Sequence, residues 1–185
     1  MNSQTPISIH INPQKILTQH FPLSEGDVVA DLGCGQHGFF TFPASKIVGK
    51  NGKVYAVDIL ERVLKQINKR KKEENIENIK IKYTNLEKFG ALDIHNNSVD
   101  KVLLVNTLFQ NKKWRDILKE ASRIVKEKGE ILIIDWVPGR TQAGPQVEHR
   151  INPEDIKDEM EKLGFILKDQ FSPSTFHFGL VFKKV

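Results

Sequence analysis

The stretch Val29-Ala-Asp-Leu-Gly-Cys-Gly-Gln-His-Gly-Phe-Phe40 decides the fold. It begins as a short apolar run and continues into the glycines Gly33, Gly35 and Gly38, which have the spacing G-x-G-x-x-G. This spacing is typical of a turn between a strand and a helix that approaches a nucleotide ligand closely. The carboxylate of Asp31, two residues before the first glycine, would repel a dinucleotide pyrophosphate by on the order of 1 kcal/mol or more. The turn therefore favours a ligand that carries a positive charge at this point.

The composition is that of one globular domain. The chain has 185 residues, of which 39% are hydrophobic and 28% charged. No segment approaches the run of about 20 apolar residues that spans a bilayer, and the first residues lack a signal-peptide pattern. We therefore expect a cytoplasmic protein with no membrane span.

Cys34 is the only cysteine, so an internal disulfide or a thiolate metal site is excluded and no metal is expected.

The net charge of +5 comes largely from one segment. Its basic residues are Lys65, Lys69, Arg70, Lys71 and Lys72. Two acids follow directly, at 73 and 74, which favours a solvated helix face over a surface for nucleic acid or anionic lipid.

Apolar runs alternate along the chain with amphipathic segments. Strands are predicted over 28–32, 54–57, 79–83, 99–105 and 130–136, and helices over 39–48, 60–74 and 114–125. Because each parallel connection needs a crossover, which a helix usually supplies, this alternation predicts a parallel sheet covered on both faces.

The last third of the chain follows a different pattern. Asn152 and the proline after it predict a helix that runs to Leu163 and stops at a glycine. Two strands, over 165–171 and 175–184, follow with only a Ser-Pro-Ser turn between them, so they must be antiparallel neighbours. We expect one domain over 25–185 and an N-terminal flap or helix over 1–24.

Polar residues stand at the carboxyl ends of four predicted strands, where ligands bind in open parallel sheets. They are Asp31, Asp58, Asn85 and Asn106. Asp and Asn also favour turns for local reasons, but four at successive strand ends indicate a binding site.

Four stretches together resemble the class I S-adenosylmethionine-dependent methyltransferases, in particular the small single-domain branch of the ubiquinone/menaquinone type. They are Asp31-Leu-Gly-Cys-Gly35, Val54-Tyr-Ala-Val-Asp58, Val99-Asp-Lys-Val-Leu-Leu-Val-Asn106 and the segment Leu118 to Gly129. The resemblance runs from about Val28 to the last residue. It implies a Rossmann-like, doubly wound, seven-stranded sheet, mostly parallel with an antiparallel C-terminal strand, and helices on both faces.

The resemblance also implies S-adenosylmethionine as the cofactor, with S-adenosylhomocysteine as its product. Asp31 would hold the amino group of the cofactor, Asp58 the ribose hydroxyls and Asn85 the adenine amino group. The whole implied cofactor set is Asp31, Gly33, Cys34, Gly35, Asp58, Ile59, Asn85, Leu86 and Asn106.

The chain departs from the family pattern at two places. Asn85 stands where the family usually has an aspartate, and Gln36-His37 adds one residue before the third glycine of the turn. We expect the loop to bulge at the added residue without displacing the contacts of Gly33 and Gly35.

Methyl transfer from a sulfonium is a direct displacement, so the protein mainly has to align the acceptor and exclude water. The residues expected to act on the acceptor are Asn106, Phe109 and Asp135, with Gln110, Trp136, His149 and Arg150 as further candidates. The segment 137–152 is expected to form a lid. A small-molecule acceptor is favoured, an RNA or protein acceptor stays open, and the protein is expected to be a monomer or homodimer.

Two alternative functions remain open. The glycine spacing alone also fits an NAD-dependent oxidoreductase, although Asp31 and the shortness of the chain disfavour it. A non-catalytic module that only binds S-adenosylmethionine would have the same cofactor residues.

Overall fold

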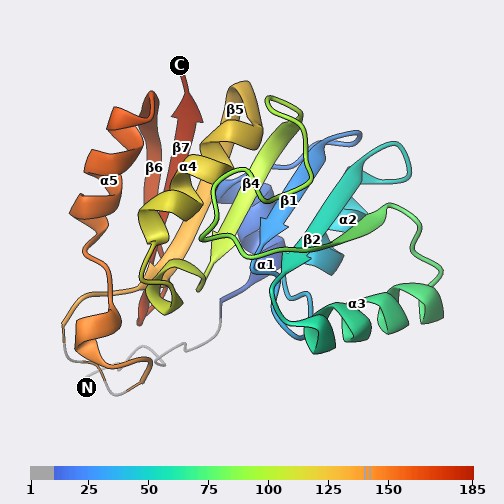
Figure 1. Cartoon of the computed structure of the whole chain (residues 1–185), viewed down its shortest axis with the longest axis horizontal. Helices are drawn as coiled ribbons and strands as arrows, with labels where there is room; N and C mark the ends of the chain where they lie inside the picture. The colour runs from blue at the N-terminus through green and yellow to red at the C-terminus, as the bar shows by residue number, and fades with distance from the viewer. Residues whose placement is uncertain (1–10, 140, 142) are drawn as a thin grey trace, which may run out of the picture.

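The computed structural model describes residues 11–139, 141 and 143–185. Its centre is a seven-stranded sheet with the strand order β3-β2-β1-β4-β5-β7-β6 (Figure 1). The strands are β1 Val28–Leu32, β2 Lys53–Asp58, β3 Ile79–Tyr83, β4 Val99–Val105, β5 Val125–Trp136, β6 Phe165–Ser174 and β7 His177–Lys184. β7 runs antiparallel to β5 and β6, whereas the pairs within β3-β2-β1-β4-β5 are parallel. The fold class predicted from the sequence is confirmed.

Helices cover both faces of this sheet. They are α1 Pro13–Lys15, the π-helix η1 Ile16–His20, α2 Thr41–Val48, α3 Glu61–Glu73, α4 Trp114–Ile124 and α5 Pro153–Lys162, with the short 3-10 helices η2 Leu108–Gln110 and η3 Val147–His149. In Figure 1, α4 and α5 lie in front of the sheet, and α1 and α2 lie behind it. The buried side chains of α3 join the apolar cluster that contains α2 and η1.

The central strands are buried on both faces, as β4 illustrates. Val102 and Leu104 pack in the cluster of α4 and α5, and Leu103 between them packs in the cluster of α2 and α3. Side chains alternate between the faces of a strand, so a strand between two helix layers needs apolar residues at every position. This is why the apolar runs in the sequence located these strands correctly.

The fifth strand begins several residues earlier than the sequence predicts. β5 starts at Val125 and not at 130, because α4 passes into it without a loop. Val125 pairs with Val99, and the register of β4 and β5 then shifts before Lys101. Lys128 has a φ of 64° within this irregular part, a conformation that the apolar pattern of the strand does not reveal.

The described part of the N-terminal segment packs on the sheet. Leu17 and Phe21 are fully buried in the cluster of α2 and α3. His20 stacks on Phe171 of β6, with ring centroids 3.9 Å apart, and its Nδ1 lies 3.0 Å from Asp169 Oδ2. Residues 1–10 lie outside the described part, so the flap stays a prediction.

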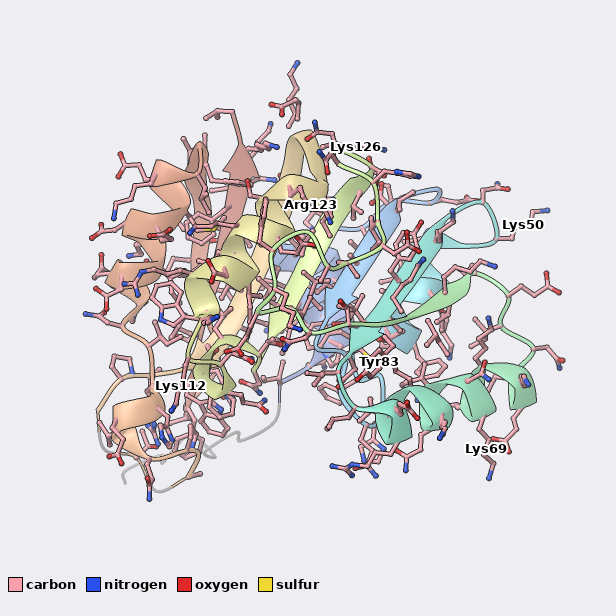
Figure 2. The ribbon with its side chains drawn as sticks, in the orientation of Figure 1. Lys50, Lys69, Tyr83, Lys112, Arg123 and Lys126 are labelled. Atoms are coloured by element: carbon pink, nitrogen blue, oxygen red, sulfur yellow. The ribbon has the colours of Figure 1, made fainter. Side chains whose placement is uncertain are left out.

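A loop connects β3 to β4 in place of a helix, and α4 holds that loop. The buried carboxylate of Glu120 accepts the N–H groups of Gly90 and Leu92, at 2.8 and 3.1 Å. Arg123, labelled in Figure 2, pairs with Glu120 and donates to the carbonyls of Leu92 and Ile94. These bonds fix the path of residues 90–94 within the loop after β3.

Three residues of the basic run on α3 pair with acids on this helix or directly after it. Lys65 pairs with Glu61, Lys69 with Glu73 and Arg70 with Glu74, each four residues apart. Lys69 points away from the sheet in Figure 2. This arrangement is that of a solvated helix face, as the sequence favoured.

No helix among the described residues has both the length and the apolar character needed to cross a bilayer. A cytoplasmic location remains a prediction from the sequence.

Candidate functional site

A cavity of about 460 Å³ lies at the carboxyl ends of the parallel strands. Its lining includes six residues of the cofactor set predicted from the sequence: Gly33, Gly35, Asp58, Ile59, Asn85 and Leu86. The volume is within the range of about 300 to 1,000 Å³ that is usual for small-molecule sites. A larger hollow of about 690 Å³ lies at the opposite end of β2, around Lys50 and Lys53, where ligands of such sheets are not expected.

Three predicted cofactor residues do not line the cavity. Asp31 and Cys34 are buried, with exposed fractions of 2% and 7%, and Asn106 lies beyond the end of β4. Their part in cofactor binding remains a prediction.

The three glycines of the turn meet different surroundings. A Cβ on Gly33 would lie 2.6 Å from the hydroxyl oxygen of Thr107, and a Cβ on Gly38 would lie 2.7 Å from Ile67 of α3. A Cβ on Gly35 would meet nothing within 4 Å, although its φ of +67° also favours glycine. Two glycines thus serve packing, and Gly35 leaves open space where a ligand can approach the backbone.

The added residue forms a tight turn above the cavity. The N–H of Gly38 donates to the carbonyl of Gly35 at 3.2 Å, with Gln36 and His37 exposed between them. Arg70 of α3 donates to the carbonyl of His37 at 3.2 Å. The extra residue is therefore accommodated in a hydrogen-bonded turn, while Gly33 still bonds to Val57 of β2 at 2.8 Å.

Asp58 joins the end of β2 to the glycine turn. One carboxylate oxygen accepts the N–H of Gly35 at 3.2 Å, and the other accepts the N–H of Leu60 at 2.9 Å. Each oxygen of a carboxylate can accept two hydrogen bonds, so both retain capacity for a ligand. Asp58 is positioned to bind a pair of hydroxyl groups in the cavity.

Asp31 lies behind the turn, at the end of β1. Its Oδ2 accepts the hydroxyl hydrogen of Thr41, with 2.5 Å between the oxygens. Burial, and to a smaller extent the charge of Asp58, raise the pKa of Asp31 to about 7, although the Thr41 bond opposes the rise. A cationic group brought nearby would favour the ionised form.

Cys34 has no sign of nucleophilic chemistry. Burial, followed by the negative charges of Asp31 and Asp58, raises the pKa of its thiol. The thiol stays protonated at neutral pH, and a protonated thiol is a poor nucleophile and a poor metal ligand.

The third strand contributes its end to the cavity through Thr84, Asn85 and Leu86. The side-chain oxygen of Asn85 accepts the N–H of Glu87 at 2.9 Å, which closes a local turn. Its amide nitrogen is a further donor at the cavity.

Sequence reasoning named Gln110 as an acceptor-side candidate but missed several other lining residues, of which Thr107 and Asn111 matter most. Thr107 directly follows a residue that the sequence singled out, and its hydroxyl donates to the carbonyl of Leu32 at 3.0 Å. Its position at a strand end is a signal that could have found it. Asn111 donates to the Thr107 carbonyl at 2.7 Å, a contact that depends on the turn formed by η2.

A second cavity of about 420 Å³ adjoins the first, because Gln110 and Asn111 line both. Phe109, His149 and Arg150, all predicted candidates for the acceptor side, line it too. The structure thus brings residues of η2 and of the segment before α5 together beside the first cavity.

Arg150 organises the described part of the predicted lid. Its guanidinium donates to the carbonyls of Val137 and Gly139, at 3.1 and 2.9 Å. It also donates to those of Ala143 and Pro145, at 3.0 and 2.9 Å. A single side chain therefore shapes this segment.

Asp135 and Asn106 are two of the predicted catalytic residues, and Asp135 directly precedes Trp136, which Gly144 of the lid approaches closely. Asp135 is 1% exposed and accepts the N–H groups of Phe109 and Trp136, at 3.1 and 2.8 Å. Burial raises its pKa to about 6. The side-chain oxygen of Asn106 is buried and has no hydrogen-bond partner among the described residues. The contacts of Asp135 hold η2 in place, and its catalytic role remains a prediction.

Comparison with known proteins identifies the family. Residues 23–177 match the family model described as a methyltransferase domain. The chain belongs to this methyltransferase-domain family. The resemblance drawn from the sequence motifs is thereby confirmed.

Individual relatives of this methyltransferase domain are distant. It is 28% identical to the demethylmenaquinone methyltransferase of Geobacillus stearothermophilus over 129 residues, which cover 70% of this chain and 53% of the relative. The chain thus spans about half the length of that relative. A SAM dependent methyltransferase from Aquifex aeolicus is 26% identical, with a TM-score of 0.84 over 95% of this chain and 90% of that one. The cyclase SpnF has a TM-score of 0.79 at 12% identity, over 97% of this chain and 88% of that one, and at this identity it shows the fold alone.

Proposed function

We propose that this methyltransferase domain transfers the methyl group of S-adenosylmethionine to a small-molecule acceptor. The observation that carries the proposal is the pairing of Gly35, which leaves open space at the turn, with Asp58, whose carboxylate faces the same cavity. The membership of the family supports it. The Aquifex aeolicus protein, similar over nearly its whole length, is described as SAM dependent.

The cavity residues fit the parts of this cofactor. Asp58 would bind the ribose hydroxyls with charge-assisted hydrogen bonds, and the side chain of Asn85 would bind the adenine. The open space at Gly35 would admit the methionine part. Asp31 lies behind Gly33 and would act on the ammonium group through a bridging water.

S-adenosylmethionine, when bound, supplies a methyl group that is already activated by the sulfonium. The chain therefore has to place an acceptor behind this methyl group and keep water out. The second cavity is the place for the acceptor, since it adjoins the first at Gln110 and Asn111. The catalytic set predicted from the sequence, Asn106, Phe109 and Asp135, lies at or beside this junction.

We propose a quinol-like small molecule as the acceptor class. Its support is the printed activity of the curated relatives, which are demethylmenaquinone methyltransferases at 27% to 28% identity. An RNA or protein acceptor is the competing class, and the largely paired charges on α3 give it no support.

Ligand-dependent melting tests the cofactor. S-adenosylhomocysteine is expected to raise the Tm of the wild-type protein, and NAD at the same concentration is not. A shift with NAD alone would favour the oxidoreductase alternative, and no shift with S-adenosylhomocysteine would refute the proposal.

Transfer of a tritiated methyl group tests turnover. Labelled product from 1,4-naphthohydroquinone with a short prenyl chain would support the quinol class. Labelled product found only in the RNA or protein fraction of a cell extract would replace the quinol class by an RNA or protein acceptor. S-adenosylhomocysteine binding with no labelled product from either source would indicate a module that binds the cofactor without catalysis.

A further inference from the structure

Two ring nitrogens behind residues that line the second cavity are buried and have no hydrogen-bond partner among the described residues. They are Nε1 of Trp136, at the end of β5, and Nε2 of His177, at the start of β7. A buried polar group without a partner loses its hydrogen bonds to water without replacement, so each such group needs an explanation.

The register of the sheet places the two rings together. Trp136 pairs with His177 across β5 and β7, and their ring centroids are 4.2 Å apart. His177 is only 3% exposed, and its other ring nitrogen, Nδ1, lies 2.7 Å from the hydroxyl of Ser174. The contact with Ser174 fixes the orientation of the imidazole and leaves Nε2 as the ring nitrogen that can bind a further group.

An aromatic ring and a guanidinium group lie near the Trp136 ring. Phe109 of η2 meets the Trp136 ring edge to face, with centroids 6.4 Å apart. The guanidinium carbon of Arg150 lies 6.0 Å from the centroid of the same ring. Both Phe109 and Arg150 also line the cavity of about 420 Å³, so this cavity extends to the side chains that pack against Trp136.

The lid covers the indole at Gly144. A Cβ at this position would lie 2.4 Å from Cε3 of Trp136, so the backbone lies directly against the ring. Gly144 has a φ of +100°.

The chemistry of the two nitrogens selects a hydroxyl group. The indole N–H of Trp136 only donates, and burial lowers the pKa of His177 to about 4, so its ring is neutral at physiological pH. A hydroxyl group can accept from the indole and can pair with Nε2 in either tautomer, because it both accepts and donates. Flat aromatic rings are the natural neighbours of Phe109 and Trp136.

We propose that Trp136 and His177 form the polar end of the acceptor site and bind the hydroxyl group of a flat aromatic acceptor. This inference rests on the proposed function, because only a methyltransferase would use the bound molecule as a methyl acceptor. The binding test itself does not require turnover. His177 and Trp136 act here as residues that orient the acceptor and determine specificity.

Indole NMR signals provide the test, because the chain has two tryptophans and Trp114→Phe assigns the signals. 1-Naphthol is the probe, and 1-fluoronaphthalene is the matched probe without the hydroxyl. We expect 1-naphthol to shift the Trp136 signal saturably, with an affinity roughly tenfold or more above that of 1-fluoronaphthalene. An unmoved Trp136 signal, or equal affinity for the two probes, would overturn the inference.

Three variants separate recognition from folding. His177→Phe keeps an aromatic ring against Trp136 and should lose the preference for the hydroxyl probe. His177→Gln retains a polar side chain and should recover at least part of it. His95→Phe makes the same change at an exposed histidine in the loop that precedes β4 and should bind like wild type. A preference unchanged in His177→Phe would refute the role of Nε2.

The melting test with S-adenosylhomocysteine is run on the same samples. His177→Phe should keep the wild-type shift, because His177 does not line the cofactor cavity. Selective 1-naphthol binding in a protein that does not respond to S-adenosylhomocysteine would support the hydroxyl site and refute the methyltransferase function. A Tm shift with S-adenosylhomocysteine without selective 1-naphthol binding would support the methyltransferase function and refute the hydroxyl site.

Discussion

Thr41, the first residue of α2, donates its hydroxyl hydrogen to the buried carboxylate of Asp31 at the end of β1, with 2.5 Å between the two oxygens. The bond ties the helix after the glycine turn to the strand before it. It also holds in place a carboxyl group that burial keeps close to half protonated at neutral pH, since its pKa is about 7.

The affinity for S-adenosylhomocysteine should rise between about pH 6 and pH 8. Ionised Asp31 attracts the ammonium group of the ligand, and the pKa of about 7 places its ionisation in this window. Titration calorimetry across the range measures the effect. Asp31→Asn should lower the affinity at pH 8 by roughly tenfold and remove the rise. Unchanged affinity in this variant would contradict the role of the charge.

The same carboxyl group should make the unliganded protein less stable as the pH rises. The folded-state pKa is raised from 3.8 to about 7, so the folded state holds the proton more tightly than the unfolded state. The contribution of Asp31 to the free energy of unfolding should therefore fall from about pH 4 to about pH 7, by on the order of 4 kcal/mol, and level off above. His177, with a pKa lowered to about 4, acts in the opposite direction and offsets the fall due to Asp135, whose pKa is about 6. The difference between wild type and Asp31→Asn in urea unfolding across this range therefore isolates Asp31.

Alanine at two glycines of the turn should have different consequences. Gly33→Ala places a Cβ against Thr107 at a φ of +80° and should cost about 2 to 4 kcal/mol of unfolding free energy. Gly35→Ala meets open space and should cost about 1 to 2 kcal/mol, but its methyl group should obstruct the ligand. Urea unfolding and calorimetry with S-adenosylhomocysteine separate the effects. Equal losses of stability would show that the Thr107 contact is unimportant.

Asp58→Ala should weaken the binding of S-adenosylhomocysteine by about 1 to 3 kcal/mol. It removes the proposed ribose contact and also the bonds to the N–H groups of Gly35 and Leu60, so some stability should be lost. Glu77→Ala removes one negative charge from an exposed site near the opposite end of the sheet and controls for net charge. Equal affinities of the two variants in calorimetry would refute the assignment of Asp58.

Gly144→Ala should lift the lid from Trp136. The added methyl group would collide with the indole, so the quenching of Trp136 fluorescence by acrylamide should increase in a Trp114→Phe background. Gly139→Ala is the matched control, since Gly139 has a similar φ of +91° but open space at its Cβ. An equal increase in both variants would show that backbone strain, and not the indole contact, moves the loop.

The strands and the cavity residues at their ends could be predicted from the sequence because their signals lie within short stretches of the chain. An apolar run that passes into a glycine turn or ends in an aspartate marks both a buried strand and its carboxyl end. Asp58 and Asn85 were found in this way, and both line the cavity.

The packing around the site and the pairing of the strands depend on contacts between residues far apart in the chain. Nothing near Gly33 indicates that Thr107 fills the space beside it, because that contact requires β1 and β4 to be neighbours. The pairing of Trp136 with His177 likewise follows from the register of β5 and β7. Periodicity predicts which residues form strands, but not which strands are paired or in what register.

The strand order also sets the order in which the parts of the protein can be completed during synthesis. The cavity proposed for the cofactor is lined by residues that all precede 112. β6, by contrast, joins the sheet only through β7, which is made after it. On the ribosome, the residues for the cofactor would emerge first, and His177 would arrive with the strand that closes the sheet. A nascent chain halted before β7 would leave the edge of β5 unpaired, which is the kind of edge that promotes aggregation.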